Sequence, residues 1–458
     1  MIESARAAPV PYITIAAVVL LVAAMWMVAT TGGTDLLVKE VLGEAYDSQA
    51  DHLLRGDAGV EADVVRWEAM IVNGKARMYF GPFPALVRIP LNLIYPAGRG
   101  AWSRLSGFCA ATIALAAFAG LTTIALRRSS LSQRGRDVLG AACLVGFVFG
   151  TPLLFLLGNV SIYNEAIIWG FGWSIAALFF LARKDGDSRS TGDLAGFAVC
   201  AGFALLARVT FGVALLLIAP LLAFEEARAR RFRRLVTLLP IAGATAFYLW
   251  LNYARFGSFT ETGYRFYINS LHRDFALSHG VFDLKRVPYS FFDYFSVIPP
   301  AFKPHPPFVA VDRHPFEYPE LFSLPFSESF ISAIWSSGWL VLPAAVGVVC
   351  LFSRTRVTGS ERWIAAALFA QFVVILSYFA LAQRYMTDLY PFLIFCFLVF
   401  LRTAGAALMR GRYVLIALII ACSAMNFLAT AAWLSADRNL PVETQRFWKL
   451  GRERSGAN

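Results

Sequence analysis

The sequence predicts an all-α, polytopic membrane protein of about 11 transmembrane helices, with outer-side loops that carry interfacial helices. Of its 458 residues, 58% are hydrophobic and 16% are charged, whereas soluble domains carry about 25% charged residues. Apolar runs of roughly 20 residues, the length that a helix needs to span a bilayer, recur between short arginine clusters. These runs do not alternate apolar with polar side chains, so a membrane β-barrel is a poor fit.

Twelve apolar runs follow one another along the chain. The first, 12–30, is predicted to be a retained helix rather than a cleaved signal peptide, because little charge precedes it and no small-residue cleavage site follows it. The run 83–94 is too short to span and contains Pro84 and Pro90, so it is predicted to be an interfacial or re-entrant piece. The remaining predicted spans are 102–126, 138–158, 165–182, 194–207, 209–224, 236–253, 329–352, 363–382, 389–401 and 413–434.

The arginine clusters predict the orientation. Cytoplasmic turns carry an excess of Lys and Arg, and this sorting explains the net charge of +11 without a nucleic-acid partner. Segments 194–207 and 209–224 are separated only by Arg208, and they are read as two crossings rather than one kinked helix because both flanks are basic. The protein is therefore expected in the inner (plasma) membrane, with a cytoplasmic N-terminus and an outer C-terminus. The basic turns lie at 127–136, 183–189, 228–234, 354–362 and 402–412.

This topology predicts one membrane domain over 1–458 with two long outer segments. The first, 31–101, is expected to hold interfacial helices, and the second, 255–327, is dense in Phe, Tyr and Pro and is expected to form a cap. The first segment is rich in acids. Glu44, Asp47 and Asp51 follow i, i+3, i+7 spacing, which places them on one helical face. Carboxylates at a membrane surface can act as general bases, bind a metal or orient a hydroxyl; the alternative is a solvated amphipathic helix.

Two further features border the membrane. Tyr79 precedes a turn fixed by Gly81 and Pro82, where aromatic side chains are expected at the interface; a purely structural turn is the alternative. Glu165 lies at the outer edge of an apolar run. Carboxylates at that depth are costly and are functional candidates, although an acid in the first turn of a helix is also favoured by the helix dipole.

Four arginines lie on the predicted outer side, where the sorting rule does not expect positive charge. A guanidinium fork suits phosphate oxygens, so these residues predict a site for the phosphate of a lipid-linked substrate. The alternative is that they extend to the headgroup boundary without binding a ligand. Asp388 follows one of them by four residues and is expected to pair with it locally. The four are Arg88, Arg208, Arg255 and Arg384.

Other chemistries lack support in the sequence. There is no HExxH, CxxC, Walker or GxSxG motif, so zinc sites, ATP-driven transport and serine hydrolysis are not indicated. No residue is predicted to bind a metal, and a requirement for a divalent cation, Mg²⁺ or Mn²⁺, is left open.

Several short motifs occur together in this layout, and through them the chain resembles the GT-C superfamily of polytopic membrane glycosyltransferases, in particular the bacterial protein-mannosyltransferase and lipid-A-type transferase group. The resemblance covers most of the chain in layout but only short pieces in motif. The motifs are Gly56-Asp57, Gly74-Lys75, Tyr79 with the Pro82/Pro84 turn, Leu206-Ala207-Arg208-Val209-Thr210, Asn252-Tyr253-Ala254-Arg255-Phe256-Gly257-Ser258, and Arg384-Tyr385 leading to Asp388 and Pro391.

The resemblance implies a donor and an active site. In that family the first outer loop carries the catalytic acid, and outer-face basic residues hold a polyprenyl-phosphate sugar. No adjacent pair of acids begins the loop here, and the nearest substitutes, Asp47 and Glu44, become the expected catalytic residues. The residues expected to bind substrate are Asp51, Glu68, Tyr79, Arg88, Glu165, Arg208, Arg255, Arg384 and Asp388.

The implied activity is an inverting transfer of a hexose or pentose. The sugar would pass from the polyprenyl-phosphate donor to a lipid or cell-envelope glycan acceptor on the outer face. Two other classes remain open: a lipid or glycan transporter that uses the same arginines and Glu165, and an inactive scaffold that keeps the fold.

Overall fold

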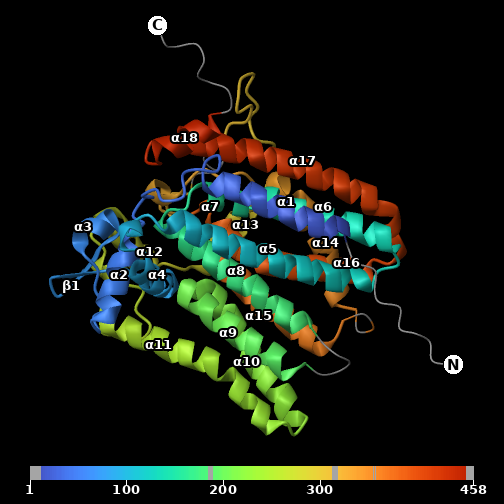
Figure 1. The fold of residues 1–458 in the computed structure, drawn as a ribbon, viewed down its shortest axis with the longest axis horizontal. Coiled ribbons are helices and arrows are strands. Elements are labelled where there is room, and N and C mark those ends of the chain that lie inside the picture. Colours follow the sequence, from blue (N-terminus) through green and yellow to red (C-terminus); the bar gives the residue numbers. More distant parts are fainter. Residues whose placement is uncertain (1–11, 184–188, 312–317, 354, 356, 450–458) are drawn as a thin grey trace.

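The computed structural model describes residues 12–183, 189–311, 318–353, 355 and 357–449. The described chain is helical apart from one short β-hairpin and isolated bridges. Long helices lie side by side across the molecule (Figure 1). They are α1 (Tyr12–Ala29), α5 (Ser103–Arg127), α6 (Gln133–Phe149), α8 (Ile162–Ala182), α9 (Thr191–Ala207), α10 (Val209–Arg228), α11 (Leu239–Phe256), α14 (Ala333–Leu351), α15 (Gly359–Leu376), α16 (Tyr390–Thr403) and α17 (Ala406–Ala436).

Each of the eleven predicted apolar segments corresponds to one of these helices, which confirms the fold class. By length and composition, nine helices in the described part of the chain could cross a membrane. The two others, α6 and α9, have 17 residues each. The predicted break at Arg208 is confirmed, because Arg208 is extended between α9 and α10.

The predicted span 138–158 is not one helix. It ends at Phe149 and resumes as the short α7 (Leu153–Gly158), because Pro152 has no N–H and disfavours a helical residue before it. Other helices satisfy the carbonyls that this break frees. Ser337 and Trp339 of α14 donate to the carbonyl oxygen of Gly150 at 2.7 and 2.9 Å. Buried backbone groups at membrane depth need such partners.

The helix ends define two faces of the molecule. We call the end that carries the turns at 127–133, 189–190, 228–238, 351–353, 357–358 and 403–405 the turn face. We call the opposite end, which carries 30–102, 257–311, 318–332 and 377–389, the loop face. The described residues of the two long segments predicted to lie outside are therefore together at one end (Figure 1). Which face lies in the cytoplasm remains a prediction.

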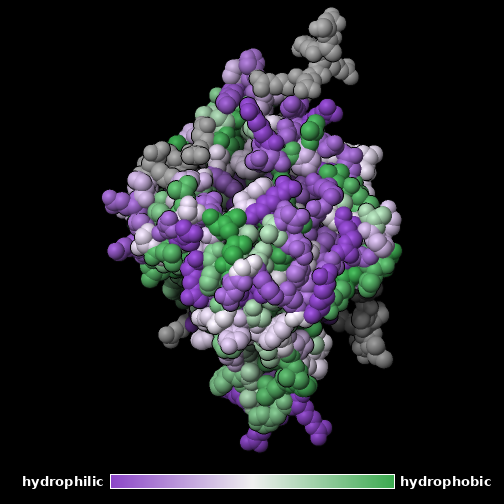
Figure 2. All heavy atoms as spheres, turned by 90° about the vertical axis from the view of Figure 1, so that its left-hand side faces the viewer, coloured by the Kyte–Doolittle hydropathy of each residue, from purple (hydrophilic) through white to green (hydrophobic). Residues whose placement is uncertain are grey.

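The loop face holds most of the short elements. Figure 2 shows hydrophilic side chains gathered over this face, with hydrophobic side chains below them, towards α10 and α11. β1 and β2 form an antiparallel hairpin in which Met70 pairs with Arg77. The elements are α2 (Glu44–Leu54), α3 (Ala62–Val65), β1 (Met70–Val72), β2 (Lys75–Arg77), α4 (Phe83–Ile94), α12 (Ser270–His279), α13 (Val287–Tyr294), the 3₁₀ helix η7 (Tyr385–Leu389) and α18 (Val442–Trp448).

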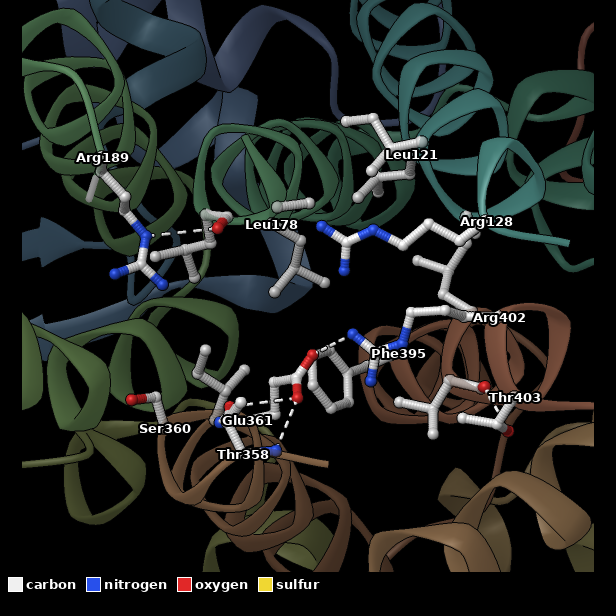
Figure 3. Close-up of a pocket in the computed structure, with 17 residues that line it drawn as sticks. Leu121, Arg128, Leu178, Arg189, Thr358, Ser360, Glu361, Phe395, Arg402 and Thr403 are labelled. Atoms are coloured by element: carbon white, nitrogen blue, oxygen red, sulfur yellow. Dashed lines mark hydrogen bonds and ion pairs between the residues drawn. The ribbon is translucent and has the colours of Figure 1, made fainter. Parts of the chain in front are cut away.

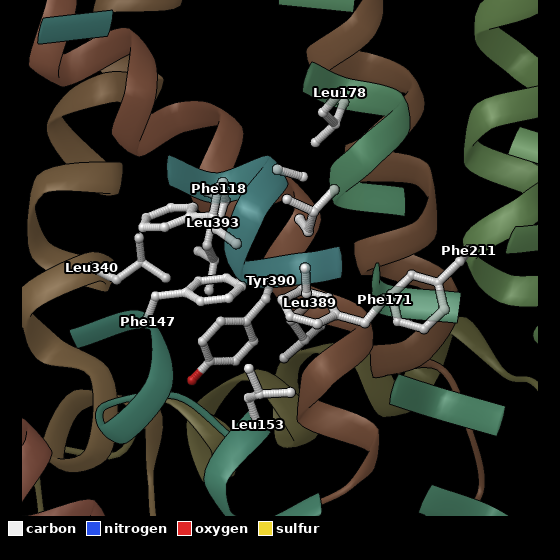
Figure 4. Close-up of a cluster of buried hydrophobic side chains, with 14 of the residues drawn as sticks. Phe118, Phe147, Leu153, Phe171, Leu178, Phe211, Leu340, Leu389, Tyr390 and Leu393 are labelled. Carbon is white, nitrogen blue, oxygen red and sulfur yellow. The ribbon is translucent and has the colours of Figure 1, made fainter. Parts of the chain in front are cut away.

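The core of the bundle combines stacked aromatic rings with close backbone contacts. Phe118 stacks on Phe147 with 4.3 Å between ring centroids, and Phe171 lies beyond it at 5.7 Å (Figure 4). A Cβ added at Gly347 of α14 would lie 1.9 Å from the carbonyl oxygen of Cys396 in α16. These two helices therefore approach each other at a distance that only glycine permits, as small residues do in membrane bundles.

Candidate active site

The acids of α2 share one face, as their spacing predicts. Glu44 pairs with Lys39, and Asp51 pairs with Arg99. Asp47 lies between them and is buried; its Oδ1 accepts from Asn92 at 2.7 Å and its Oδ2 from the backbone N–H of Gly100 at 3.2 Å. Both oxygens of this predicted catalytic carboxylate are therefore already hydrogen-bonded, one to α4 and the other to the loop that leads into α5.

Asp47 belongs to a buried charge cluster with two other predicted residues. Arg88 of α4 donates to Glu165 of α8 at 2.8 Å and to Ser103 at 3.2 Å, and its Nε lies 3.6 Å from Asp47. The side chains of Arg88 and Glu165 are 0% exposed. Burial raises the pKa of Asp47, and the positive charge of Arg88 acts against that rise. These contacts connect α2 and α4 of the first outer segment to α8 of the bundle.

Glu68 lies in a second cluster, made of tyrosines. It is buried, and its Oε1 accepts from the hydroxyl of Tyr163 at 2.7 Å. Burial raises the pKa of Glu68, and hydrogen bonds from Tyr163, Tyr267 and Tyr79 oppose this effect together with the charge of Arg384. A buried carboxyl whose pKa is raised binds a proton more readily than an ordinary glutamate does, which suits a general base.

Arg208 and Asp388 form the third cluster, and here the sequence prediction was wrong. The Nε of Arg208 donates to both oxygens of Asp388, at 3.0 and 3.1 Å, and Thr210 also donates to this carboxylate. Asp388 was expected to pair with Arg384. Residues 385–389 instead form the 3₁₀ helix η7. A 3₁₀ helix has three residues per turn, so the side chains of Arg384 and Asp388, four positions apart, point to different sides.

Arg384 instead pairs with Glu328, which directly follows the predicted cap, and its guanidinium lies 4.5 Å from the centroid of the Tyr163 ring. Glu328 was not singled out in the sequence, because nothing in its local context marks a partner 56 positions away. Tyr163 and Tyr267 were also missed as Glu68 partners. The density of Tyr in the cap was the only available signal for Tyr267.

Arg255, the last predicted cation, is near the C-terminus of α11. Its side chain is buried, and its Nε and Nη2 have no hydrogen-bond partner among the described residues. The backbone around it is held by Asn252, which donates to the carbonyl oxygens of Ser258, Phe259 and Glu261 at 2.9–3.1 Å. Gly257 has φ +72°, which lets the chain turn sharply after α11. The predicted motif 252–258 is thus a helix end followed by a fixed turn.

A groove of about 430 Å³ lies where α10, α11 and residues 259–264 and 281–282 meet on the loop face. Polar groups mark one part of it: Arg208, Thr210, Asn252 and the tyrosines 79, 264, 378 and 385. Apolar side chains of α10 and α11 line the rest, and several of them are exposed on the surface of the bundle. The lining residues that are exposed hydrophobics are Val209, Val213, Leu249, Phe259 and Phe282.

The structure does not gather all the predicted residues in one pocket. Tyr79 and Arg208 line the groove, and Glu68 reaches it through Tyr79. Asp47, Arg88 and Glu165 form their own buried cluster, and the other acids of α2 pair locally. Within the described residues there is no group of three or more His, Cys, Asp or Glu side chains that could hold a metal ion; whether the protein needs a divalent cation stays open.

Comparisons with known proteins identify similar folds. No protein-family model and no curated protein matches the sequence. ArnT from Cupriavidus metallidurans bound to undecaprenyl phosphate matches with a TM-score of 0.46 and 15% identity, over 94% of this chain and 67% of that chain. The oligosaccharyltransferase of Archaeoglobus fulgidus in the apo form matches with a TM-score of 0.48 and 14% identity, over 96% of this chain and 56% of that chain.

The likeness to these two structures concerns the fold alone. The chain is similar to them in the layout of its helices. It spans 67% and 56% of their lengths, at identities of 15% or less. The function proposed below is therefore inferred from the residues of this chain and not from these two proteins.

Proposed function

We propose that the protein is a membrane glycosyltransferase that takes a sugar from a polyprenyl-phosphate donor and passes it to a lipid or cell-envelope glycan acceptor at the loop face. The groove at Arg208 is the observation that carries this proposal. It combines a cation and hydroxyl groups with an apolar wall on the outside of the bundle. A donor of this kind has the same two parts, a charged phosphate with a sugar and a long apolar chain.

Arg208 is the proposed ligand of the donor phosphate. Asp388 occupies its Nε, and its Nη1 and Nη2 make no hydrogen bond to a described residue. Since guanidinium carries five N–H donors, the terminal nitrogens can bind two phosphate oxygens while Asp388 fixes the plane of the group. The apolar chain would lie against Val213 of α10 and Leu249 of α11, which are 44% and 36% exposed.

Glu68 is the proposed general base. Tyr79 lines the groove and hydrogen-bonds Glu68, so this carboxylate is adjacent to the proposed sugar position. Asp47 and Glu44, the bases predicted from the resemblance, already contact Asn92, Gly100 and Lys39. In this proposal Asp47 positions Arg88 and the loop.

The proposed reaction is a single displacement. The acceptor hydroxyl oxygen attacks the anomeric carbon while its proton moves to Glu68. The bond between that carbon and the phosphate oxygen breaks, and the electron pair leaves with the polyprenyl phosphate. Negative charge grows on the phosphate in the transition state, where the guanidinium of Arg208 stabilises it. This order of events inverts the configuration at the sugar.

A transporter is the competing class. It would need charged groups along a path between the two faces. The groove instead lies at the loop-face ends of α10 and α11, where Thr210 and Asn252 line it. This position favours chemistry at the membrane surface over transport.

The test is sugar transfer by the purified protein in proteoliposomes, with a panel of polyprenyl-phosphate sugars and with divalent ions chelated or supplied. Arg208→Gln is expected to lower kcat by about 10²–10³, the usual cost of removing a donor that stabilises transition-state charge. Lys285→Gln is the control, because Lys285 is an exposed cation on the loop face and outside the groove lining. Equal turnover by the two variants would remove Arg208 from the proposed role, and no turnover of any donor by the wild type would reject the enzyme itself.

A further inference from the structure

A second cavity, of about 760 Å³, opens at the opposite end of the molecule, on the turn face. It lies between α5 and α8 on one side and α15 and α16 on the other. Figure 3 shows Arg128 and Arg189 entering it from different sides, with the pair Arg402–Glu361 nearby. Neither the proposed reaction nor the groove at Arg208 uses this cavity.

The polar lining of this turn-face cavity carries excess positive charge. Three arginines line it against one carboxylate, that of Glu361, which pairs with Arg402 and caps α15 through Thr358. Arg189 is buried; it donates to the carbonyl oxygen of Leu181 at 3.2 Å and pairs with Glu225 at 2.6 Å. The side chain of Arg128 makes no hydrogen bond or ion pair to a described residue, and the residue is exposed at the cavity mouth.

The depth of the cavity is apolar. Leu121, Leu178 and Ile364 line it and are buried, and the half-buried Phe395 and Leu398 line it as well. A free phosphate ion would fill only a small part of 760 Å³, since a water molecule occupies about 30 Å³ of liquid. The cavity therefore fits a ligand that joins an anionic head to an apolar body.

We propose that the turn-face cavity binds the phosphate headgroup of an anionic membrane phospholipid, with Arg128 as its principal contact and the start of an acyl chain against Leu121 and Phe395. Basic pockets between membrane helices are suited to anionic headgroups, because guanidinium groups pair with phosphate oxygens at the depth where lipids place them. This site is distinct from the groove at Arg208 and does not depend on the proposed transfer.

The experiment is lipid binding to the full-length protein, measured by native mass spectrometry after delipidation. The probes are phosphatidylglycerol, phosphatidylcholine and inorganic phosphate, each titrated separately. The wild type is expected to bind one phosphatidylglycerol at least tenfold more tightly than phosphatidylcholine. Arg128→Ala is expected to weaken phosphatidylglycerol binding about tenfold, the scale of one lost charge-assisted hydrogen bond.

Arg127→Ala is the matched control, because Arg127 is the neighbouring exposed arginine of α5 and lies outside the cavity lining. Leu398→Trp fills the apolar part without changing the charge, and it is expected to weaken lipid binding as well. Equal effects of Arg128→Ala and Arg127→Ala would overturn the site. Inorganic phosphate that competes with phosphatidylglycerol at equal concentration would overturn the lipid and assign the cavity to a free phosphate. Thermal unfolding of each variant shows that it is folded.

Discussion

At the scale of single residues, the proposed site depends on how each buried charge is partnered. Glu68 has tyrosine hydroxyls around it, Arg208 has Asp388, and Arg88 has Glu165. The first two reach the groove and the third does not. Glu68 and Arg208 are therefore expected to act in catalysis, and Arg88 and Glu165 in stability. Substitutions at each position can distinguish the two roles.

Glu68→Gln is expected to abolish most turnover, because an amide cannot accept the acceptor's proton. Loss of a general base costs about 10²–10⁴ in rate. In the wild type, the acidic limb of the kcat/KM profile should lie above the ordinary glutamate pKa of 4.5, since burial raises the pKa of Glu68 and the base must be deprotonated to act. Asp63→Asn, on the exposed surface of the same loop, is the control. Should Asp47→Asn or Glu44→Gln remove activity while Glu68→Gln does not, the base is on α2.

The pair Arg88–Glu165 is expected to act on stability. Glu165→Gln leaves the fully buried guanidinium of Arg88 with Asp47, at 3.6 Å, as its remaining carboxylate, and breaking a buried ion pair costs about 3–5 kcal/mol. Thermal unfolding in detergent should show a clear fall in Tm. Asp274→Asn removes an ion pair whose carboxylate is 66% exposed, and it should leave Tm nearly unchanged. A Glu165→Gln protein as stable as the Asp274→Asn protein would contradict a structural role.

At the scale of helices, the apolar runs predicted the elements well, because hydrophobic length dominates in a membrane. The sequence missed what depends on contacts between distant segments. At the Gly150–Pro152 break, the carbonyl oxygen of Gly150 accepts from Ser337 and Trp339, and those of Phe149 and Thr151 accept from Asn426. The partner of Asp388 changed because residues 385–389 form a 3₁₀ helix, which the sequence pattern did not indicate. Periodicity within one segment carries no information on either point.

The close contact between α14 and α16 at Gly347 can be tested by a substitution. Gly347→Ala is expected to force α14 away from α16, because the added Cβ would lie 1.9 Å from the carbonyl oxygen of Cys396. A loss of about 1–3 kcal/mol is usual for overpacking, and it would appear as a lower Tm. Gly243→Ala in α11 adds the same methyl group where no atom lies within 4 Å. Equal Tm values for the two variants would contradict the close contact.

At the scale of the whole molecule, the two faces divide the proposed functions. The loop face holds the acidic loop, the tyrosine cluster and the groove, and the turn face holds the basic turns and the second cavity. The sequence predicted this division from the distribution of arginine alone. It did not predict either cavity, since each is formed by side chains from helices far apart in the chain.

The orientation of the faces can be measured in cells. In a variant without its six cysteines, a single cysteine at Ser278 of α12 should react with a membrane-impermeant maleimide added from outside. A cysteine at Ser130 in the turn after α5 should react only after the membrane is permeabilised. The opposite pattern would place the loop face in the cytoplasm and end the proposal of an outer-face transferase.

The central claim, that the groove at Arg208 holds the donor, is tested most directly by a cryo-electron microscopy structure of the protein in nanodiscs with a polyprenyl phosphate. The phosphate is expected about 3 Å from the terminal nitrogens of Arg208, a charge-assisted hydrogen-bond distance. The polyprenyl chain is expected to lie along α10 and α11. A phosphate bound at another site, with the groove at Arg208 empty of lipid, would contradict this claim.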